Sequence, residues 1–117
     1  APDLEDGELD DALDVILSAG IDGVIAANTT ISREGLRSPL AAEAGGLSGA
    51  PLKARSREMV RKIVGRTGGK LPVIGAGGIM SPQDARERLE AGAALVQVYT
   101  GLVYAGPGLV KQILESR

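Results

Sequence analysis

Short apolar runs alternate with amphipathic segments along the 117 residues of this chain. Three of the runs predict strands: Val24–Ala27, a run centred on Val73 and Ile74, and Leu95–Tyr99. Such mostly apolar runs are typical of buried strands in a parallel sheet, and we expect Val24–Ala27 to be buried on both faces. Each run ends in small, polar or hydroxyl residues, so the strands open into loops rich in backbone polar groups.

Four segments with apolar residues at helical spacing predict amphipathic helices. The first has an acidic first turn and ends at Gly20, and the third begins at Ser81 and Pro82, which suit a helix cap and a first helical position. This alternation with the strands requires a parallel sheet with right-handed crossovers, so the fold class is α/β. The helices are expected over residues 6–20, 52–64, 81–92 and 109–114. The first should bury a face made of Leu9, Ala12, Leu13, Ile16 and Leu17.

Composition excludes several classes of function. The net charge is −2 with both signs interspersed, which favours neither nucleic acid nor an anionic membrane as a partner. The chain has no Cys and no His, so it lacks a thiolate nucleophile and the commonest metal ligand, and no metal site is predicted. No apolar stretch is long enough to cross a membrane, and no signal peptide is visible. These features are typical of a soluble α/β chain.

Glycine and hydroxyl residues follow two neighbouring strands of the predicted sheet. Gly75, Gly77 and Gly78 end the second strand, and Tyr99 and Thr100 end the third. Two such loops side by side can direct several backbone N–H groups at one phosphate, as after the last strands of a (β/α)8 barrel. The plainer alternative is a tight strand-to-helix turn that needs glycine only for its geometry, with the Tyr99 ring covering the strand ends.

The length of the chain limits the fold that it can complete. A whole (β/α)8 barrel needs roughly 250 residues, and this chain has less than half of that number. We therefore expect residues 1–117 to form a single partial domain, the C-terminal part of such a barrel with about three parallel strands and their helices. We interpret the chain as part of a longer protein.

The long segment between the first strand and the second helix carries a second group of polar residues. Asn28 and Thr29 follow the strand directly, and the glycine-rich stretch Gly45–Gly49 comes later. A loop this long inside a compact domain is usually functional. The Asn28 amide both donates and accepts, so this pair could bind a ring with alternating carbonyl and N–H groups, or its carboxylate. A polar turn and a plain flexible loop are the alternatives.

Charged residues offer no candidate for acid–base catalysis. Arg33, Arg37 and Lys53 flank the long loop, and we interpret them as solvated surface residues rather than ligands of an anionic substrate. The acidic residues of the first helix are interpreted in the same way. An enzyme built on this chain must therefore take its acid or base from elsewhere, or use a cofactor for the difficult chemistry.

Five segments, spread over nearly the whole chain, carry a resemblance to a known family through their order and the spacings between them. They are Ala1–Leu4, Asp22–Thr30, Gly45–Leu52, Pro72–Ile79 and Ala91–Thr100. As an ordered set they resemble the dihydroorotate dehydrogenases, whereas any one of them alone would be a weak signal. The stretches Tyr99–Gly101 and Gly106–Pro107 are similar to the quinone-dependent, membrane-associated class of that family.

The resemblance implies an FMN enzyme of de novo pyrimidine (UMP) biosynthesis, which oxidises (S)-dihydroorotate to orotate and passes electrons to a quinone. It implies that Asn28 and Thr29 bind the pyrimidine substrate and that Ser48 and Gly49 approach the flavin. The FMN phosphate would be held by main-chain and hydroxyl groups of Gly77, Gly78, Tyr99 and Thr100. Ala27 stands where the family often has a flavin-contacting Thr, which leaves only its backbone for that contact.

The resemblance also implies that essential parts of such an enzyme lie outside this chain. The flavin-contacting lysine would directly precede Ala1, and the serine base would lie further upstream, so we expect no catalytic residue here and no turnover from this chain alone. The quinone site and the peripheral attachment to the cytoplasmic face of a bacterial membrane would belong to an N-terminal helical extension.

Three other interpretations fit parts of the pattern. One is another FMN barrel oxidoreductase, of the dihydropyrimidine or dihydrouridine type. Another is a non-catalytic half-barrel that binds phosphate or pairs with a copy of itself through its unpaired strand edges. The third is a truncated gene fragment with no activity of its own.

Overall fold

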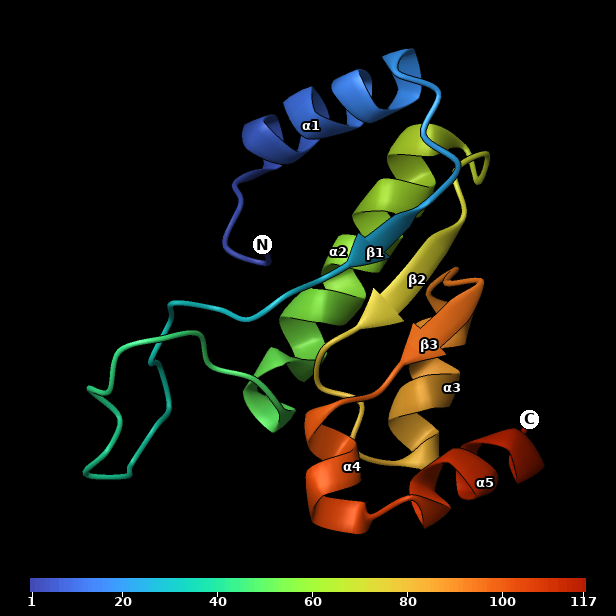
Figure 1. The fold of residues 1–117 in the computed structure, drawn as a ribbon. Helices are drawn as coiled ribbons and strands as arrows, with labels where there is room; N and C mark the ends of the chain where they lie inside the picture. Colours follow the sequence, from blue (N-terminus) through green and yellow to red (C-terminus); the bar gives the residue numbers. More distant parts are fainter.

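Three parallel strands organise the chain, and the computed structural model describes all 117 residues (Figure 1). The strands lie in the order β1–β2–β3 in one sheet. In chain order the elements are α1 (Asp6–Ser18), β1 (Val24–Ala26), the 3-10 turn η1 (Ala50–Leu52), α2 (Lys53–Thr67), β2 (Val73–Ala76), α3 (Pro82–Glu90), β3 (Leu95–Gln97), α4 (Thr100–Ala105) and α5 (Gly108–Glu115).

The sheet confirms the predicted α/β class with three parallel strands. Ala26 of β1 pairs with Gly75 of β2, which in turn pairs with Val96 of β3. Because all strands run in the same direction, their carboxyl ends meet at one edge, and the loops that follow them are neighbours. The long β1–α2 loop (residues 27–52), the β2–α3 turn (residues 77–81) and the start of α4 therefore lie at the same end of the sheet (Figure 1).

Helices cover only one face of the sheet. α2 packs against β1 and β2, and α3 packs against β3, so both helices lie on the same side in Figure 1. Side chains alternate along each strand, and Ile25 and Leu95, which point to the uncovered face, are both 61% exposed. The expectation that Val24–Ala27 is buried on both faces is therefore wrong, because the chain supplies no layer over that face.

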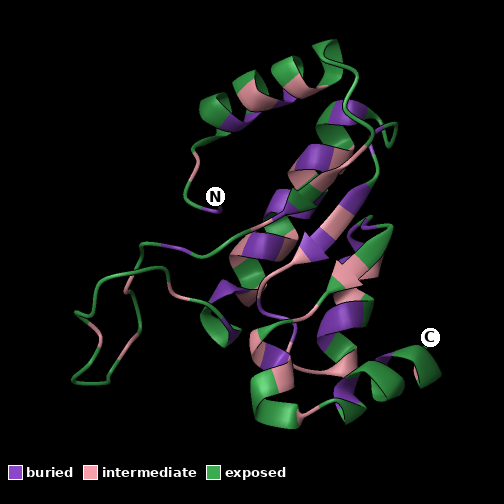
Figure 2. Ribbon diagram, viewed as in Figure 1, coloured by how far each residue is buried: buried purple, intermediate pink, exposed green.

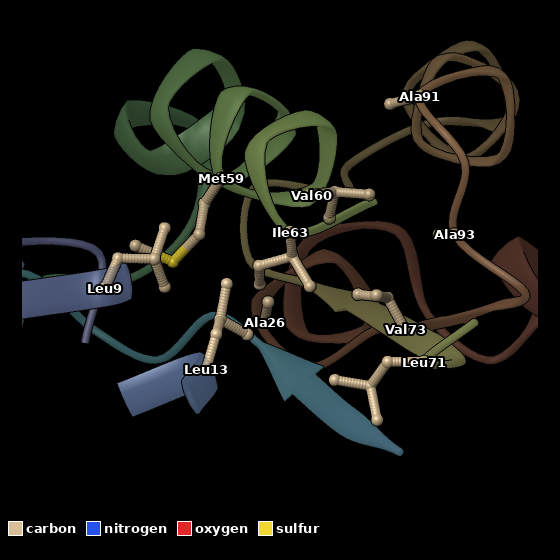
Figure 3. Close-up of a cluster of buried hydrophobic side chains, with 10 residues drawn as sticks. All are labelled: Leu9, Leu13, Ala26, Met59, Val60, Ile63, Leu71, Val73, Ala91 and Ala93. Carbon is tan, nitrogen blue, oxygen red and sulfur yellow. The ribbon is translucent and has the colours of Figure 1, made fainter. Parts of the chain in front are cut away.

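The apolar core lies between α1, α2 and the sheet. Figure 3 shows the larger of two clusters, in which Met59 and Ile63 of α2 meet Leu9 and Leu13 of α1 and Val73 of β2. A smaller cluster under α5 joins Ile79, Ala85, Leu109 and Ile113. The two clusters fix α2, α3 and α5 against the sheet, and with them the loops at its carboxyl edge.

The predicted helices are all present, with local differences. α1 begins with a capping box in which Glu5 and Glu8 satisfy each other's backbone N–H groups, and it buries Leu9 and Leu13. Leu17, predicted on the same face, is 43% exposed, whereas Ile16 is partly buried against the core. Figure 2 shows α1 as mostly exposed, with separate buried and intermediate positions along it. The short helix α4 is an addition, since its six residues carry no capping signal in the sequence.

Ion pairs join the outer faces of α1 and α2. Lys62 of α2 contacts Asp6 at 2.6 Å and Glu58 at 3.0 Å, and Arg66 contacts Asp10 and Asp14 of α1. The acidic residues of α1 are exposed, as expected, but three of them pair with a basic residue of α2. Ion pairs this exposed each contribute little to the free energy of unfolding. Their main effect is on the orientation of α1 relative to α2.

Candidate functional site

A cavity of about 510 Å³ opens at the carboxyl edge of the sheet. Residues from all three strand ends and from the β1–α2 loop line it. All nine site residues predicted from the sequence are among them: Ala27, Asn28, Thr29, Ser48, Gly49, Gly77, Gly78, Tyr99 and Thr100. The structure thus brings the predicted residues to one place, while the ligands assigned to them remain a prediction.

No charged side chain lines this cavity. Its polar groups are hydroxyls, the amides of Asn28 and Gln97, and backbone N–H groups. The N–H groups of Gly77, Gly78, Thr100 and Gly101 donate to no other group of the protein. Buried or half-buried N–H groups without a partner are uncommon, and several that converge on one cavity suit a phosphate oxygen or another anion.

The β2–α3 turn is held from the helix side by Asp84. The Asp84 carboxylate accepts hydrogen bonds from the Met80 N–H and the Ser81 hydroxyl, both at 3.0 Å, and pairs with the Lys53 ammonium at 2.7 Å. Burial raises the pKa of the Asp84 carboxyl, but the bonds from Lys53, Met80 and Ser81 outweigh it and hold the pKa below its ordinary value. Asp84 is therefore ionised and fixes the far end of the turn to α2.

Gly77 and Gly78 both have positive φ, at +95° and +74°. A Cβ at Gly78 would lie 2.5 Å from the Cα of Lys53, at the start of α2, so this position has no room for a side chain. A Cβ at Gly77 would make only ordinary contacts, at 3.4 Å or more. The two glycines thus differ: both provide the backbone conformation, and Gly78 also allows the turn to contact α2.

The β1–α2 loop reaches across to α4 at Ser48. The Ser48 and Thr100 hydroxyls are 2.8 Å apart, and a Cβ at Gly49 would lie 3.0 Å from the Cγ2 of Thr100. Gly49 itself is buried and has a positive φ. This contact closes one side of the cavity and brings two distant predicted segments together.

Asn28 and Thr29 line the same cavity. The Thr29 N–H donates to the Asn28 side-chain oxygen at 2.8 Å, which is the polar turn considered as an alternative. The bond uses only the oxygen, so the Asn28 amide N–H groups stay free to donate, and both residues line the cavity. A Cβ at Gly46 would overlap the Thr29 side chain, so the glycine-rich stretch packs directly against this pair.

Arginine and lysine residues near the loop have structural partners. Arg33 donates to the carbonyls of Thr30, at 3.2 Å, and Glu43, at 3.1 Å, and also to that of Gly45. Arg33 and Lys53 are half-exposed and do not line the cavity, as expected, but each also has a structural partner: Arg33 bonds to the loop carbonyls, and Lys53 pairs with Asp84. Arg37 is exposed, as expected.

Sequence reasoning missed several residues of the cavity wall. Gln97 ends β3 and lines the cavity, and a polar residue within an apolar strand was the available signal. Ile25 and Met80 contribute apolar surface.

No helix of the structure is long and apolar enough to cross a bilayer.

The cavity is suited to binding a ligand but offers few side chains for proton transfer. Its neutral donors suit a phosphate, and its mixed amide, hydroxyl and apolar surface suits a planar polar ring. No carboxylate, lysine, histidine or cysteine lines it, so the cavity holds none of the side chains that most often act as a general base.

Comparison with known protein families gives one clear match. The family model for dihydroorotate dehydrogenase matches residues 1–116. A protein from Anaeromyxobacter sp. (strain Fw109-5), named dihydroorotate dehydrogenase (quinone), is 53% identical over 99% of this chain and 32% of its own length. A protein of the same name from Chromobacterium violaceum is 55% identical over 99% of this chain and 34% of its own length. The chain thus spans about a third of the length of these curated relatives.

Solved structures agree with the sequence comparison. The crystal structure of ligand-free DHODH from Eimeria tenella superposes with a TM-score of 0.94 and 46% identity. The match covers 99% of this chain and 33% of the Eimeria chain. A second Eimeria structure, in complex with ferulenol, superposes with the same TM-score. The three strands and their helices are therefore part of a (β/α)8 barrel, as predicted, and the chain belongs to the dihydroorotate dehydrogenase family.

Proposed function

We propose that residues 1–117 form the FMN-phosphate-binding part of a quinone-dependent dihydroorotate dehydrogenase. The reaction would be the oxidation of (S)-dihydroorotate to orotate in pyrimidine biosynthesis. The single observation that carries the proposal is the convergence of free N–H groups from Gly77, Gly78, Thr100 and Gly101 on one cavity. The names of the relatives at 53% and 55% identity support the choice of reaction.

The residues present fit the phosphate end of FMN. Neutral N–H and hydroxyl donors can surround a phosphate without the constraint of a fixed ion pair, and glycines allow close backbone approach. Gly77, Gly78, Tyr99 and Thr100 would hold the phosphate, while Ser48, Gly49 and the Ala27 backbone would lie along the flavin. When bound, FMN supplies an acceptor for the hydride equivalent that leaves dihydroorotate.

The substrate side of the proposal rests on Asn28 and Thr29. Dihydroorotate has alternating carbonyl and N–H groups and a carboxylate, and the Asn28 amide with the Thr29 hydroxyl offers matching donors and acceptors. These residues would bind and orient the ring. The proton acceptor would come from another part of the full-length protein, because the cavity holds no suitable base. We expect no turnover from residues 1–117 alone.

The word quinone in the names of the relatives supports the choice of electron acceptor. We propose a quinone as the acceptor and peripheral attachment of the full-length protein to the cytoplasmic face of the membrane. Both would depend on residues outside this chain. The alternatives, another FMN barrel oxidoreductase or a non-catalytic half-barrel, are not favoured, because the matched proteins carry the dihydroorotate dehydrogenase name.

The proposal is tested with the full-length protein and its Asn28→Ala variant. We expect FMN in the purified protein and dihydroorotate oxidation with a short-chain ubiquinone analogue, but not with NAD⁺ or fumarate. Asn28→Ala should raise the KM for dihydroorotate by about tenfold, from the loss of roughly one to two hydrogen bonds, with the FMN content unchanged.

Arg37→Gln is the matched control, because Arg37 is an exposed residue of the same loop and does not line the cavity. Absence of FMN, or activity with NAD⁺ or fumarate instead of the quinone, would overturn the proposal. An unchanged KM in Asn28→Ala would overturn the substrate assignment.

A further inference from the structure

Arg88 of α3 is the largest fully buried side chain of the structure, at 1% exposure. Its guanidinium donates to two carbonyls of the β2–α3 connection: Ala76, at 3.2 Å, and Gly77, at 2.9 Å. It also donates to the Ser56 hydroxyl at 2.8 Å and to the Lys53 carbonyl at 3.4 Å. A single side chain thus joins the end of β2 to the first turn of α2.

These bonds determine the direction of the free amides. In a planar trans peptide, the carbonyl of one residue and the N–H of the next point in opposite directions. The Ala76 carbonyl accepts from Arg88 and Ser56 and also from the Ala27 N–H that follows β1, at 2.9 Å, so the Gly77 N–H points away from these three donors. The Gly77 carbonyl accepts from Arg88, which turns the Gly78 N–H away from the guanidinium. Both glycines line the cavity.

Burying the charged side chain of an arginine costs desolvation free energy. Arg88 takes part in no ion pair, and its Nε atom is buried without a hydrogen-bond partner. Burial lowers the pKa of the guanidinium from its ordinary value, although Asp84 acts in the opposite direction, and arginine stays protonated. Apolar residues of similar volume often give equal or greater stability at such positions. Stability alone therefore does not explain this residue.

The β2 strand is built to admit the Arg88 side chain. Gly75 lies in the middle of the sheet, and a Cβ there would overlap the Cγ of Arg88 and lie 2.8 Å from its Cδ. Glycine in a strand interior is otherwise unfavourable. The glycine that the sequence indicated as part of a ligand loop thus makes room for Arg88.

We infer that Arg88 is a positioning residue for phosphate binding: it presets the Gly77 and Gly78 amides and places a fixed positive charge directly behind them. The inference rests on the proposed FMN site. Because the cavity itself has no cationic side chain, this buried charge polarises the amides toward the phosphate without contacting it. It acts through the peptide groups and is not a catalytic residue.

The test compares FMN with riboflavin, which lacks the phosphate. Dissociation constants of both are measured by flavin fluorescence on the full-length protein freed of FMN, for the wild type and for Arg88→Met, Arg88→Lys and Ser56→Ala. The preference for FMN over riboflavin should fall about tenfold or more in Arg88→Met, as expected when charge-assisted hydrogen bonds are lost. Arg88→Lys should recover part of the preference, and Ser56→Ala should lose a smaller part.

Arg86→Met is the control, because Arg86 is an exposed arginine of the same helix. The Arg86→Met protein should keep the wild-type preference for FMN over riboflavin. An equal loss of FMN and riboflavin affinity in Arg88→Met, accompanied by a lower Tm, would show a structural role only and overturn the inference. If Arg88→Met does not fold, an unchanged preference in both Arg88→Lys and Ser56→Ala would overturn it. Wild-type protein that binds no FMN would instead overturn the proposed function, and the inference with it.

Discussion

The hydroxyl groups of Ser48 and Thr100 lie 2.8 Å apart, although 52 residues separate them in the chain. This contact links the β1–α2 loop to the start of α4 and forms one side of the cavity. Its neighbour Gly49 has room for no side chain larger than hydrogen without pressing on Thr100. The position of the loop therefore depends on a contact with the first residue of α4, which follows the last strand of the sheet.

Removing either hydroxyl should loosen this side of the site. We expect Ser48→Ala and Thr100→Val each to weaken FMN binding to the full-length protein about three- to tenfold, because each loses a hydrogen bond of roughly 1 kcal/mol. If the two residues act through each other, the double variant should lose less than the sum of the single losses. A titration of the four proteins by flavin fluorescence measures this coupling, and strictly additive losses would contradict it.

Gly78 should tolerate alanine less well than other glycines with positive φ. Gly69→Ala is the matched control, because Gly69 has φ +73° with no atom within 4 Å of an added Cβ, whereas Gly78 has φ +74° and contacts the Lys53 backbone. We expect Gly69→Ala to lower the free energy of unfolding by about 1 kcal/mol and Gly78→Ala by about 1–3 kcal/mol more. Urea unfolding of the full-length protein measures both, and equal losses would show that the turn can move away from α2.

The parallel sheet and the residues around the cavity could be predicted because both follow from local patterns. Alternating helices and apolar runs specify a parallel sheet, and the carboxyl ends of parallel strands must share an edge. Residues that follow strands, such as Asn28, Gly77 and Thr100, therefore had to be neighbours. The polar character of these ends then indicated a binding site.

The features that could not be predicted from the sequence depend on what each residue contacts in three dimensions. Ile25 and Leu95 lie in apolar runs that are typical of buried strands. Both are exposed because no layer of this chain covers that face of the sheet. Arg88 lies in a charged helix segment that is typical of a solvated face, and only the packing of α3 against Gly75 shows that it is buried. The Ser48–Thr100 contact leaves no local signal at either residue.

Asp84 should make the stability of the protein depend on pH in acid. Its pKa is lowered in the folded state relative to the ordinary value of 3.8, so the unfolded chain binds a proton first as the pH falls. The stabilisation is present above about pH 4 and is lost as the pH falls through the folded-state pKa. Asp84→Asn should therefore be less stable than the wild type by about 1–2 kcal/mol at pH 7, from its lost hydrogen bonds, and the difference should shrink toward pH 3.

Urea unfolding of the full-length protein at pH 7, 5, 4 and 3 tests this dependence. Asp11→Asn is the control, since Asp11 is exposed on α1 and takes part in no ion pair. A difference between the wild type and Asp84→Asn that stays constant down to pH 3 would show that the carboxylate charge of Asp84 has no part in holding the turn.

Gly75→Ala should reproduce the effect of removing Arg88, even though it leaves every charge in place. The added methyl group would occupy the space of the Arg88 Cγ and Cδ atoms, so the guanidinium would have to leave the Ala76 and Gly77 carbonyls or β2 would have to shift. Gly65→Ala, in the interior of α2 with no atom within 4 Å of the new Cβ, should instead stabilise the protein by about 0.5–1 kcal/mol. We expect the preference for FMN over riboflavin to fall in Gly75→Ala and to stay unchanged in Gly65→Ala, as measured by fluorescence titration. If Gly75→Ala kept the wild-type preference, the turn could hold its amides in place without the Arg88 bonds, and the glycine would serve only the packing of the sheet.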